Sequence, residues 1–173
     1  KTRVILVNPD DTAAIVDVII HGPDGIIDAP AGRGLVISPL DRLTVQLDVL
    51  APGVAATAFH VLARTGRIGA SVDDEQRSGL QSVGTDWIPQ AALPATKVYV
   101  PGVINGLGAR VLSIVSTTDN DANVTVRVIS PDGTYEPAER NTFTVTAGAV
   151  VTTDMTPALP QTPDGSLPVT LEL

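Results

Sequence analysis

A long internal repeat constrains this chain more than any other feature. Eleven residues recur unchanged 108 positions further along, with no gap between the copies. In the first copy they are Val7, Asp11, Ala14, Val16, Val18, Pro23, Asp24, Gly25, Thr44, Pro52 and Val61. Similar apolar residues match elsewhere, such as Phe59 with Leu167. A repeat of this length is a domain rather than a solenoid unit of about 20 to 50 residues. We therefore expect two modules, 1–90 and 97–173.

Both copies alternate apolar and polar residues, as half-buried strands do. Val124, Val126 and Val128 alternate with Thr125 and Arg127. Turns rich in Gly and Pro, including Pro-Asp-Gly after this strand in each copy, separate short strands, and no long helix is indicated. The sequence predicts an all-β fold of two tandem immunoglobulin-like or fibronectin-like β-sandwiches.

The segment between the modules, 73–96, is polar and then rich in Pro and Ala, so we predict a linker there. Matching the copies leaves each module one strand short, at opposite ends of the chain. We expect Lys1–Val7 and Pro168–Leu173 to present unpaired edges. Such edges would support self-association or pairing with a protein partner.

Composition argues against several classes of partner. The net charge is −8 and aromatic residues make up 3% of the chain, so no basic or base-stacking surface for nucleic acid is expected. No apolar run reaches the length of about 20 residues that a membrane span needs, so we expect no membrane insertion. The absence of cysteine excludes disulfides and thiolate catalysis.

Two acidic clusters are candidates for calcium sites. Asp119 and Asp121 lie in an Asp-Asn-Asp loop of the second module, and Asp73 and Asp74 lie at the module junction. Asp and Asn are also common turn residues, so solvated loops explain both clusters as well.

Trp87 is the single tryptophan, and it follows Asp86. An exposed indole beside a carboxylate is suited to stacking on a sugar ring, and Arg67 is a nearby candidate for contacting an anionic glycan. The alternative is that Trp87 is buried, either between the modules or over one end of a sandwich.

Nothing in the sequence indicates an enzyme or a bound cofactor. His21 and His60 are the two histidines, neither belongs to a nucleophile motif, and we expect both on the surface. Glycine-rich stretches lack the strand, loop and helix context of a phosphate-binding site.

Several segments resemble a known family. They are VNPDDTAAIVDVIIHGPDG, VSTTDNDANVTVRVISPDG, LDVLAPG at 47–53 and GTDWIP at 84–89. The chain resembles an uncharacterised family of actinobacterial secreted or membrane-tethered envelope proteins, a domain of unknown function with tandem β-sandwich repeats. The resemblance implies an extracytoplasmic location and no established activity. We expect a non-enzymatic structural or protein-interaction module of the cell envelope, or alternatively a cell-wall polysaccharide-binding module centred on Trp87.

Overall fold

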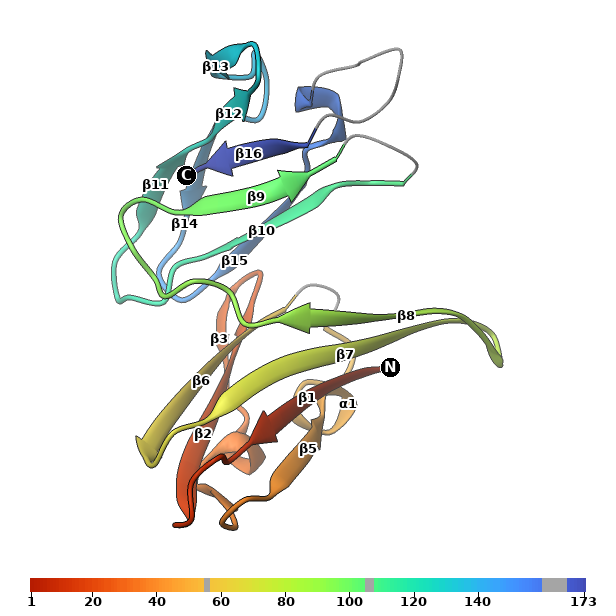
Figure 1. The fold of residues 1–173 in the computed structure, drawn as a ribbon, viewed down its shortest axis with the longest axis vertical. Helices are drawn as coiled ribbons and strands as arrows, with labels where there is room; N and C mark the ends of the chain where they lie inside the picture. Colours follow the sequence, from red (N-terminus) through yellow and green to blue (C-terminus); the bar gives the residue numbers. More distant parts are fainter. Residues whose placement is uncertain (55–56, 105–107, 160–167) are drawn as a thin grey trace. The chain divides into compact units, whose positions relative to one another are not determined.

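The computed structural model describes residues 1–54, 57–104, 108–159 and 168–173, and nearly all of its regular structure is β-strand (Figure 1). The strands are β1 (Thr2–Val7), β2 (Ala14–Gly22), β3 (Gly25–Ile27), β4 (Leu35–Ile37), β5 (Arg42–Gln46), β6 (Ala58–Thr65), β7 (Gly69–Ser78), β8 (Gln81–Pro89), β9 (Tyr99–Val103), β10 (Val111–Val115), β11 (Ala122–Thr125), β12 (Arg127–Ser130), β13 (Gly133–Tyr135), β14 (Thr142–Val145), β15 (Val150–Asp154) and β16 (Val169–Glu172). The helical elements are the short α1 (Leu47–Leu50), η1 (Pro30–Gly32) and η2 (Thr156–Ala158). The prediction of an all-β sandwich fold is confirmed.

The chain divides into two compact units. The first comprises Lys1–Gly22 and Ile26–Ala91, and the second comprises Pro23–Gly25 and Ala92–Leu173. Each unit has its own cluster of buried apolar side chains, and the two clusters share no residue.

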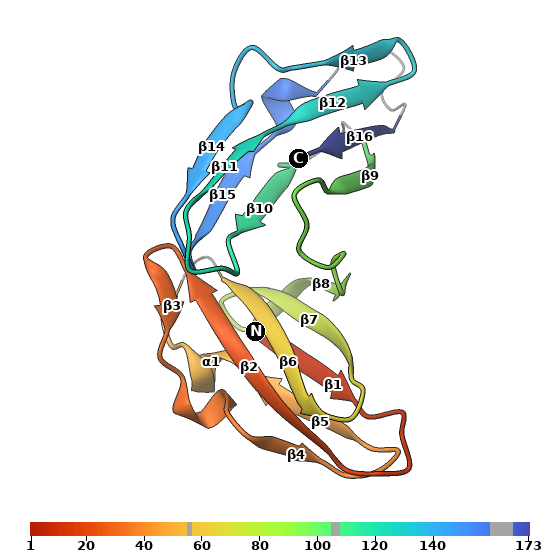
Figure 2. The same cartoon turned by 90° about the vertical axis from the view of Figure 1, so that its left-hand side faces the viewer.

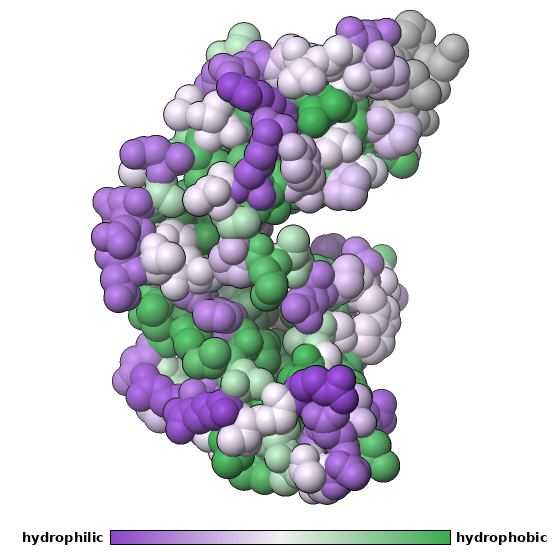
Figure 3. All heavy atoms as spheres, turned by 60° about the vertical axis from the view of Figure 1, so that its left-hand side comes forward, coloured by the Kyte–Doolittle hydropathy of each residue, from purple (hydrophilic) through white to green (hydrophobic). Residues whose placement is uncertain are grey.

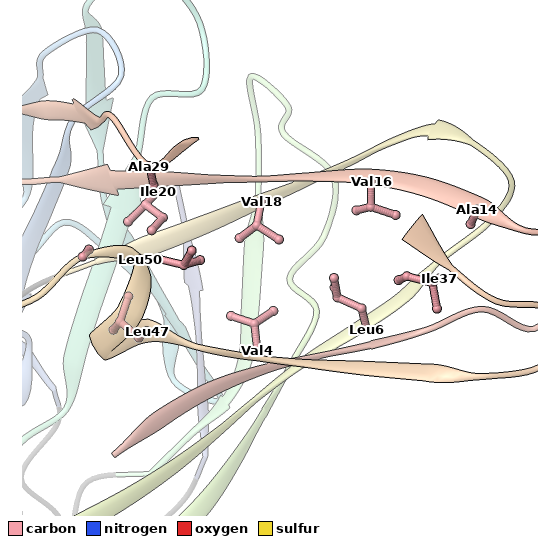
Figure 4. Packing of buried hydrophobic residues seen from close by; sticks show 11 residues of the cluster. Val4, Leu6, Ala14, Val16, Val18, Ile20, Ala29, Ile37, Leu47 and Leu50 are labelled. Atoms are coloured by element: carbon pink, nitrogen blue, oxygen red, sulfur yellow. The ribbon is translucent and has the colours of Figure 1, made fainter. Parts of the chain in front are cut away.

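The first unit is a sandwich of two antiparallel sheets (Figure 2). One sheet has the order β5-β1-β7-β8, and in the other β2 pairs with β3, β4 and β6. Val4 and Leu6 of β1 point across the interior toward Val16 and Val18 of β2 (Figure 4). Because successive side chains of a strand point to opposite faces, the alternate residues of β1 and β2 fill the core.

In the second unit the sheet that matches β5-β1-β7-β8 is smaller and consists of β10 and β15. The other strands form a sheet of order β13-β12-β16-β9 and a pair of β11 with β14. Val126, Val128, Met155, Val169 and Leu171 are buried in its core. Both cores are aliphatic, as the scarcity of aromatic residues predicted.

The same strand pairings occur in both units at matched positions. Leu6 pairs with Leu43 and Ile114 with Val151, while Ala14 pairs with Ile37 and Ala122 with Val145. Each residue of a pair in the second unit lies 108 positions after its counterpart in the first unit.

The last strand departs from this spacing. Ile20 pairs with Phe59, but Val128, 108 positions after Ile20, pairs with Leu171, which is 112 positions after Phe59. The gap-free alignment is therefore wrong for this strand. Leu167, which the alignment matched with Phe59, lies outside the described residues.

The loop after β1 in the first unit and the loop after β10 in the second are closed in the same way. The buried Asn8 donates from Nδ2 to the Thr12 carbonyl at 2.8 Å, and Ser116, at the matched position, donates from Oγ to the Asn120 carbonyl at 2.9 Å. Asn8 also donates to the carbonyls of Ile37 and Ser38. An asparagine amide thus satisfies several buried carbonyls that would otherwise lose their bonds to water.

A glycine allows one turn of the first unit to pack closely on β2. A Cβ atom at Gly32, in η1, would lie 2.6 Å from the Val18 carbonyl oxygen. At the matched position of the second unit stands Arg140, with φ of 62°, and its guanidinium donates to the Asp154 carbonyl.

Two predictions about chain organisation are wrong. Most of the expected linker at 73–96 is regular structure, because β7 and β8 form a hairpin that continues the first sheet. The expected open edges are also absent: β1 lies between β5 and β7, and β16 lies between β12 and β9. The end of β7 and all of β8 are exposed, and their polar residues give this hairpin the composition of a linker.

Asp17 forms a polar clamp on the outer face of β2. Its Oδ1 accepts the Gly34 N–H at 2.7 Å, and its Oδ2 accepts from Arg64 Nε at 2.7 Å. The Gly34 N–H and then the Arg64 guanidinium lower the pKa of Asp17 below its usual value. This carboxylate joins β6 and the segment before β4 to β2.

Replacing a core valine in either unit should destabilise that unit. Val18→Ala and Val126→Ala each remove buried methyl groups and should lower the free energy of unfolding by about 1–3 kcal/mol. Because the buried clusters are separate, we expect two thermal transitions by calorimetry, with each variant shifting one. Val36→Ala, at an exposed position of β4, is the control. A single transition shifted equally by both variants would contradict separate folding.

The Asp17 clamp should make the first unit sensitive to acid. A carboxyl group whose pKa is lower in the folded than in the unfolded state stabilises the fold at pH values above its unfolded pKa. This stabilisation is lost as the pH falls through the folded pKa. We expect the unfolding temperature of the first unit to decrease as the pH is lowered below about 4. Asp17→Asn should reduce this dependence of the unfolding temperature on pH. Asp28→Asn, which removes an ion pair exposed on both sides, should have a smaller effect. An unchanged pH profile for Asp17→Asn would exclude this role.

Candidate interaction surface

The hairpin of β7 and β8 carries the most exposed strand of the first unit. Every residue of β8 is exposed to solvent. β1 pairs with β7 only as far as Asp74, and the Glu75 N–H then donates to the Lys1 carbonyl at 3.0 Å. Beyond Glu75 no other strand of the described residues pairs with the hairpin, and it projects past the end of the sheet (Figure 1).

The tip of this hairpin exposes one large apolar side chain, Leu80, among polar neighbours. Gly79 adopts φ of 60°, which a glycine accepts without strain, and Ser78 pairs with Gln81 across the turn. Leu80 at the tip is 97% exposed. Val83 is the extra residue of a bulge, because Gln76 pairs with Gly84 and Arg77 with Ser82. Apolar side chains also reach the surface among polar ones elsewhere on the chain (Figure 3).

Trp87 lies on the outer face of the first sheet. Arg3 pairs with Asp73, and Asp73 pairs with Trp87, so the three form a row across β1, β7 and β8. Since Val4 and Leu6 face the core, this row faces away from it. Trp87 is 59% exposed, so the hypothesis of a buried tryptophan is wrong.

Next to Trp87 in this row is a covered ion pair. Asp73 Oδ2 accepts a hydrogen bond from Arg3 Nη2, and the Asp73 side chain is only 6% exposed. Among the described residues, Asp73 Oδ1 and Arg3 Nε have no hydrogen-bond partner. The pair therefore retains one buried acceptor atom and one buried donor atom that no described residue satisfies.

The other two predicted ligand residues do not join Trp87. Asp86 alternates with Trp87 along β8, so it lies on the opposite face, and its Oδ1 accepts the Trp87 backbone N–H at 2.8 Å. Arg67 precedes β7 and contacts Asp10, with Nε 3.1 Å from Oδ1. This bond lowers the pKa of Asp10 and raises that of Arg67. Arg3 was not predicted from the sequence as a site residue. It shares a row with Trp87 only because β7 and β8 form a hairpin, which the sequence did not predict.

Three of the four calcium candidates have a separate hydrogen-bond partner within the protein, and the fourth is exposed. Asp121 Oδ1 accepts the Ala147 N–H at 2.9 Å, and Asp119 is exposed. Asp73 contacts Arg3, and Asp74 Oδ1 accepts from Thr2 Oγ1 at 2.7 Å. Within the described part of the chain, no group of three or more His, Cys, Asp or Glu is placed to hold a metal ion. The structure brings neither pair together with further such side chains.

The surface prediction is wrong for His21. Its side chain is buried, and its ring stacks on His60 with centroids 6.3 Å apart. His21 stands opposite the small Ala58, which leaves room for the ring of His60 at the diagonal position.

Comparison with known proteins identifies a family and nothing more specific. Among the residues that the structure describes, no helix is long and apolar enough to span a membrane. No curated protein and no solved structure matches the chain. The model of DUF5719, described as a family of unknown function, matches residues 1–168. With this match over nearly its whole length, the chain belongs to the DUF5719 family.

Proposed function

We propose that the protein is a non-enzymatic structural or protein-interaction module of the cell envelope, and that the β7–β8 hairpin is the surface it offers to a protein partner. The observation that carries this proposal is the projection of the hairpin beyond its sheet with apolar side chains exposed. Leu80 (97% exposed) and Val83 (63%) lie on the projecting part, and Trp87 (59%) and Ile88 (52%) lie where β8 pairs with β7 inside the sheet. Large apolar side chains gathered on one exposed hairpin are typical of an interaction site.

The hairpin is built to bind through side chains rather than by adding a strand. In β8 the Trp87 N–H is already bonded to Asp86, and Pro89 has no N–H to donate. The bulge at Val83 further interrupts the edge. These features protect an edge from strand pairing, so the apolar side chains are the available contacts.

The extracytoplasmic location and the tandem architecture belong to the same proposal. The family resemblance supports a location outside the cytoplasm, and the lack of a catalytic motif in the sequence supports a non-enzymatic role. The pairings shared 108 positions apart support two copies of one module, which suits a spacer or display protein.

Crosslinking at the hairpin tip tests the protein-partner proposal. A photoreactive amino acid at Leu80 should capture one discrete envelope protein in intact cells. The same group at Leu40, which is 74% exposed outside the hairpin, should not. Adding Trp87→Ala should weaken the capture at the tip. The same products at both positions, or a protein found in the cytoplasmic fraction, would refute the proposal.

A second candidate function is binding of cell-wall polysaccharide at Trp87. The exposed indole on the outer sheet face favours it, because an aromatic face on a flat surface can stack on a sugar ring. The Asp73–Arg3 pair supplies polar groups in the same row.

The single tryptophan gives a direct test of this alternative. Soluble cell-wall polysaccharide should change the intrinsic fluorescence of the chain, because Trp87 is its only indole. Trp87→Ala should abolish retention on immobilised polysaccharide, whereas Leu80→Ser should leave it unchanged. Unaltered emission together with no retention would eliminate the glycan hypothesis and leave the protein-partner proposal standing.

A further inference from the structure

A cavity of about 410 Å³ opens at one corner of the second unit. Its wall runs from Tyr135 of β13 through the turn 136–140 to residues 157–159, at the end of η2. Tyr135 pairs with the buried Val128, so its side chain lies on the core-facing side of the sheet. Its hydroxyl donates to the Ala158 carbonyl at 3.3 Å, so the ring bridges β13 and η2. The cavity therefore lies beside the core of this unit.

The matched turn of the first unit packs directly on its sheet. A Cβ atom at Gly32 would lie 2.6 Å from the Val18 carbonyl oxygen, which leaves no space between the turn and β2. Glu139 and Arg140 stand 108 positions after Ala31 and Gly32, and both are exposed and line the cavity. Two long charged side chains thus replace two small residues at this corner, and the turn of the second unit borders a cavity.

Two of the charged side chains that line the cavity are balanced by neighbours. Glu136 Oε1 accepts a hydrogen bond from Arg127 Nε at 3.0 Å. Arg140 donates to the Asp154 carbonyl, and its charge also acts on the Asp154 carboxylate. The pKa of that carboxyl group is lowered first by hydrogen bonds from Thr156 and further by Arg140. Neither Glu136 nor Arg140 therefore leaves an uncompensated charge at the cavity.

The charge of Glu139 is not balanced in this way. Its side chain forms no hydrogen bond or ion pair with any residue that the structure describes. The rest of the wall is largely apolar, with the Tyr135 ring, Pro157 and the buried Pro137 and Leu159. A single carboxylate beside an aromatic ring suits an ammonium ion, because both attract a cation. The apolar side chains suit the methylene groups of an alkyl chain.

We propose that this cavity binds an alkylammonium group, as carried by a small amine or by a lysine side chain. The ammonium group lies at the Glu139 carboxylate and the Tyr135 ring, and the alkyl chain lies against Pro137 and Pro157. A volume of about 410 Å³ is within the usual range for a small-ligand pocket. The site uses residues of the second unit alone, so the proposal is independent of the role of the β7–β8 hairpin.

Titration of the 173-residue chain with n-hexylamine at pH 7, followed by the backbone amide resonances in NMR spectra, gives the first test. We expect shifts confined to residues around the cavity and a dissociation constant in about the millimolar range, as for other very small ligands. Hexanoate has the same chain length and the opposite charge, and it should not bind. Glu139→Gln should weaken hexylamine binding about fivefold by removing one charge contact.

Asp119→Asn is the matched control for Glu139→Gln. Asp119 is exposed in the same unit, so its replacement changes the net charge equally without touching the cavity. Hexylamine affinity should be unchanged in this variant. Equal weakening by both variants, equal binding of hexanoate, or shifts that lie away from the cavity would overturn the proposal.

Filling the cavity tests its shape without changing its charge. Ala138 is an exposed residue of the wall, so Ala138→Phe should reduce hexylamine binding at least about tenfold. Ala95→Phe makes the same change at an exposed position outside the wall and should leave binding intact. Undiminished binding in Ala138→Phe would refute the cavity as the site.

A lysine capped as its acetyl and methylamide derivative distinguishes the two sources of the ammonium group. Binding of this compound, with the same loss in Glu139→Gln, would assign the cavity to a lysine side chain of a partner. Binding of hexylamine alone would assign it to a small free amine. Binding of neither compound would refute the proposal.

Discussion

The packing of two aliphatic sheet faces is the constraint on which this structure depends. The fully buried residues of both cores are aliphatic, with one partly buried phenylalanine packed against each, Phe59 and Phe143. Val4 and Leu6 must instead meet Val16 and Val18 closely enough for small branched side chains to exclude water. Displacing either strand by one residue would turn Arg3 of β1 or Asp17 of β2 toward the interior, so these two side chains and the buried valines fix the registers.

The alternation of apolar and polar residues explains which parts of the fold could be predicted from the sequence. The strand around β11 and the start of β12 was predicted because Val124, Val126 and Val128 alternate with the polar Thr125 and Arg127. The β7–β8 hairpin was missed because both faces of β8 are solvated, which leaves no apolar period to detect. Arg3 and Asp73 beside Trp87 were missed for the same reason, since only the strand register brings them together.

The order of the strands explains why the terminal strands are not the interaction surface that the sequence predicted. The sequence led us to expect unpaired edges at Lys1–Val7 and Pro168–Leu173. In the structure β1 lies between β5 and β7, and β16 lies between β12 and β9, so both terminal strands are inner strands of their sheets. The four-residue shift before the last strand shows how the second unit departs from the first without losing its core.

The turn at Gly32 also has a consequence for how the two halves diverge. In the first unit, the absence of a side chain lets this turn rest against β2, while in the second a long cationic side chain, Arg140, reaches to β15 from the matched position. One arrangement depends on the close approach of two backbones and the other on a side-chain hydrogen bond. Gly32→Arg would place a Cβ atom against the Val18 carbonyl and Arg140→Gly would remove the bond to Asp154, so neither half can take the residue of the other without loss.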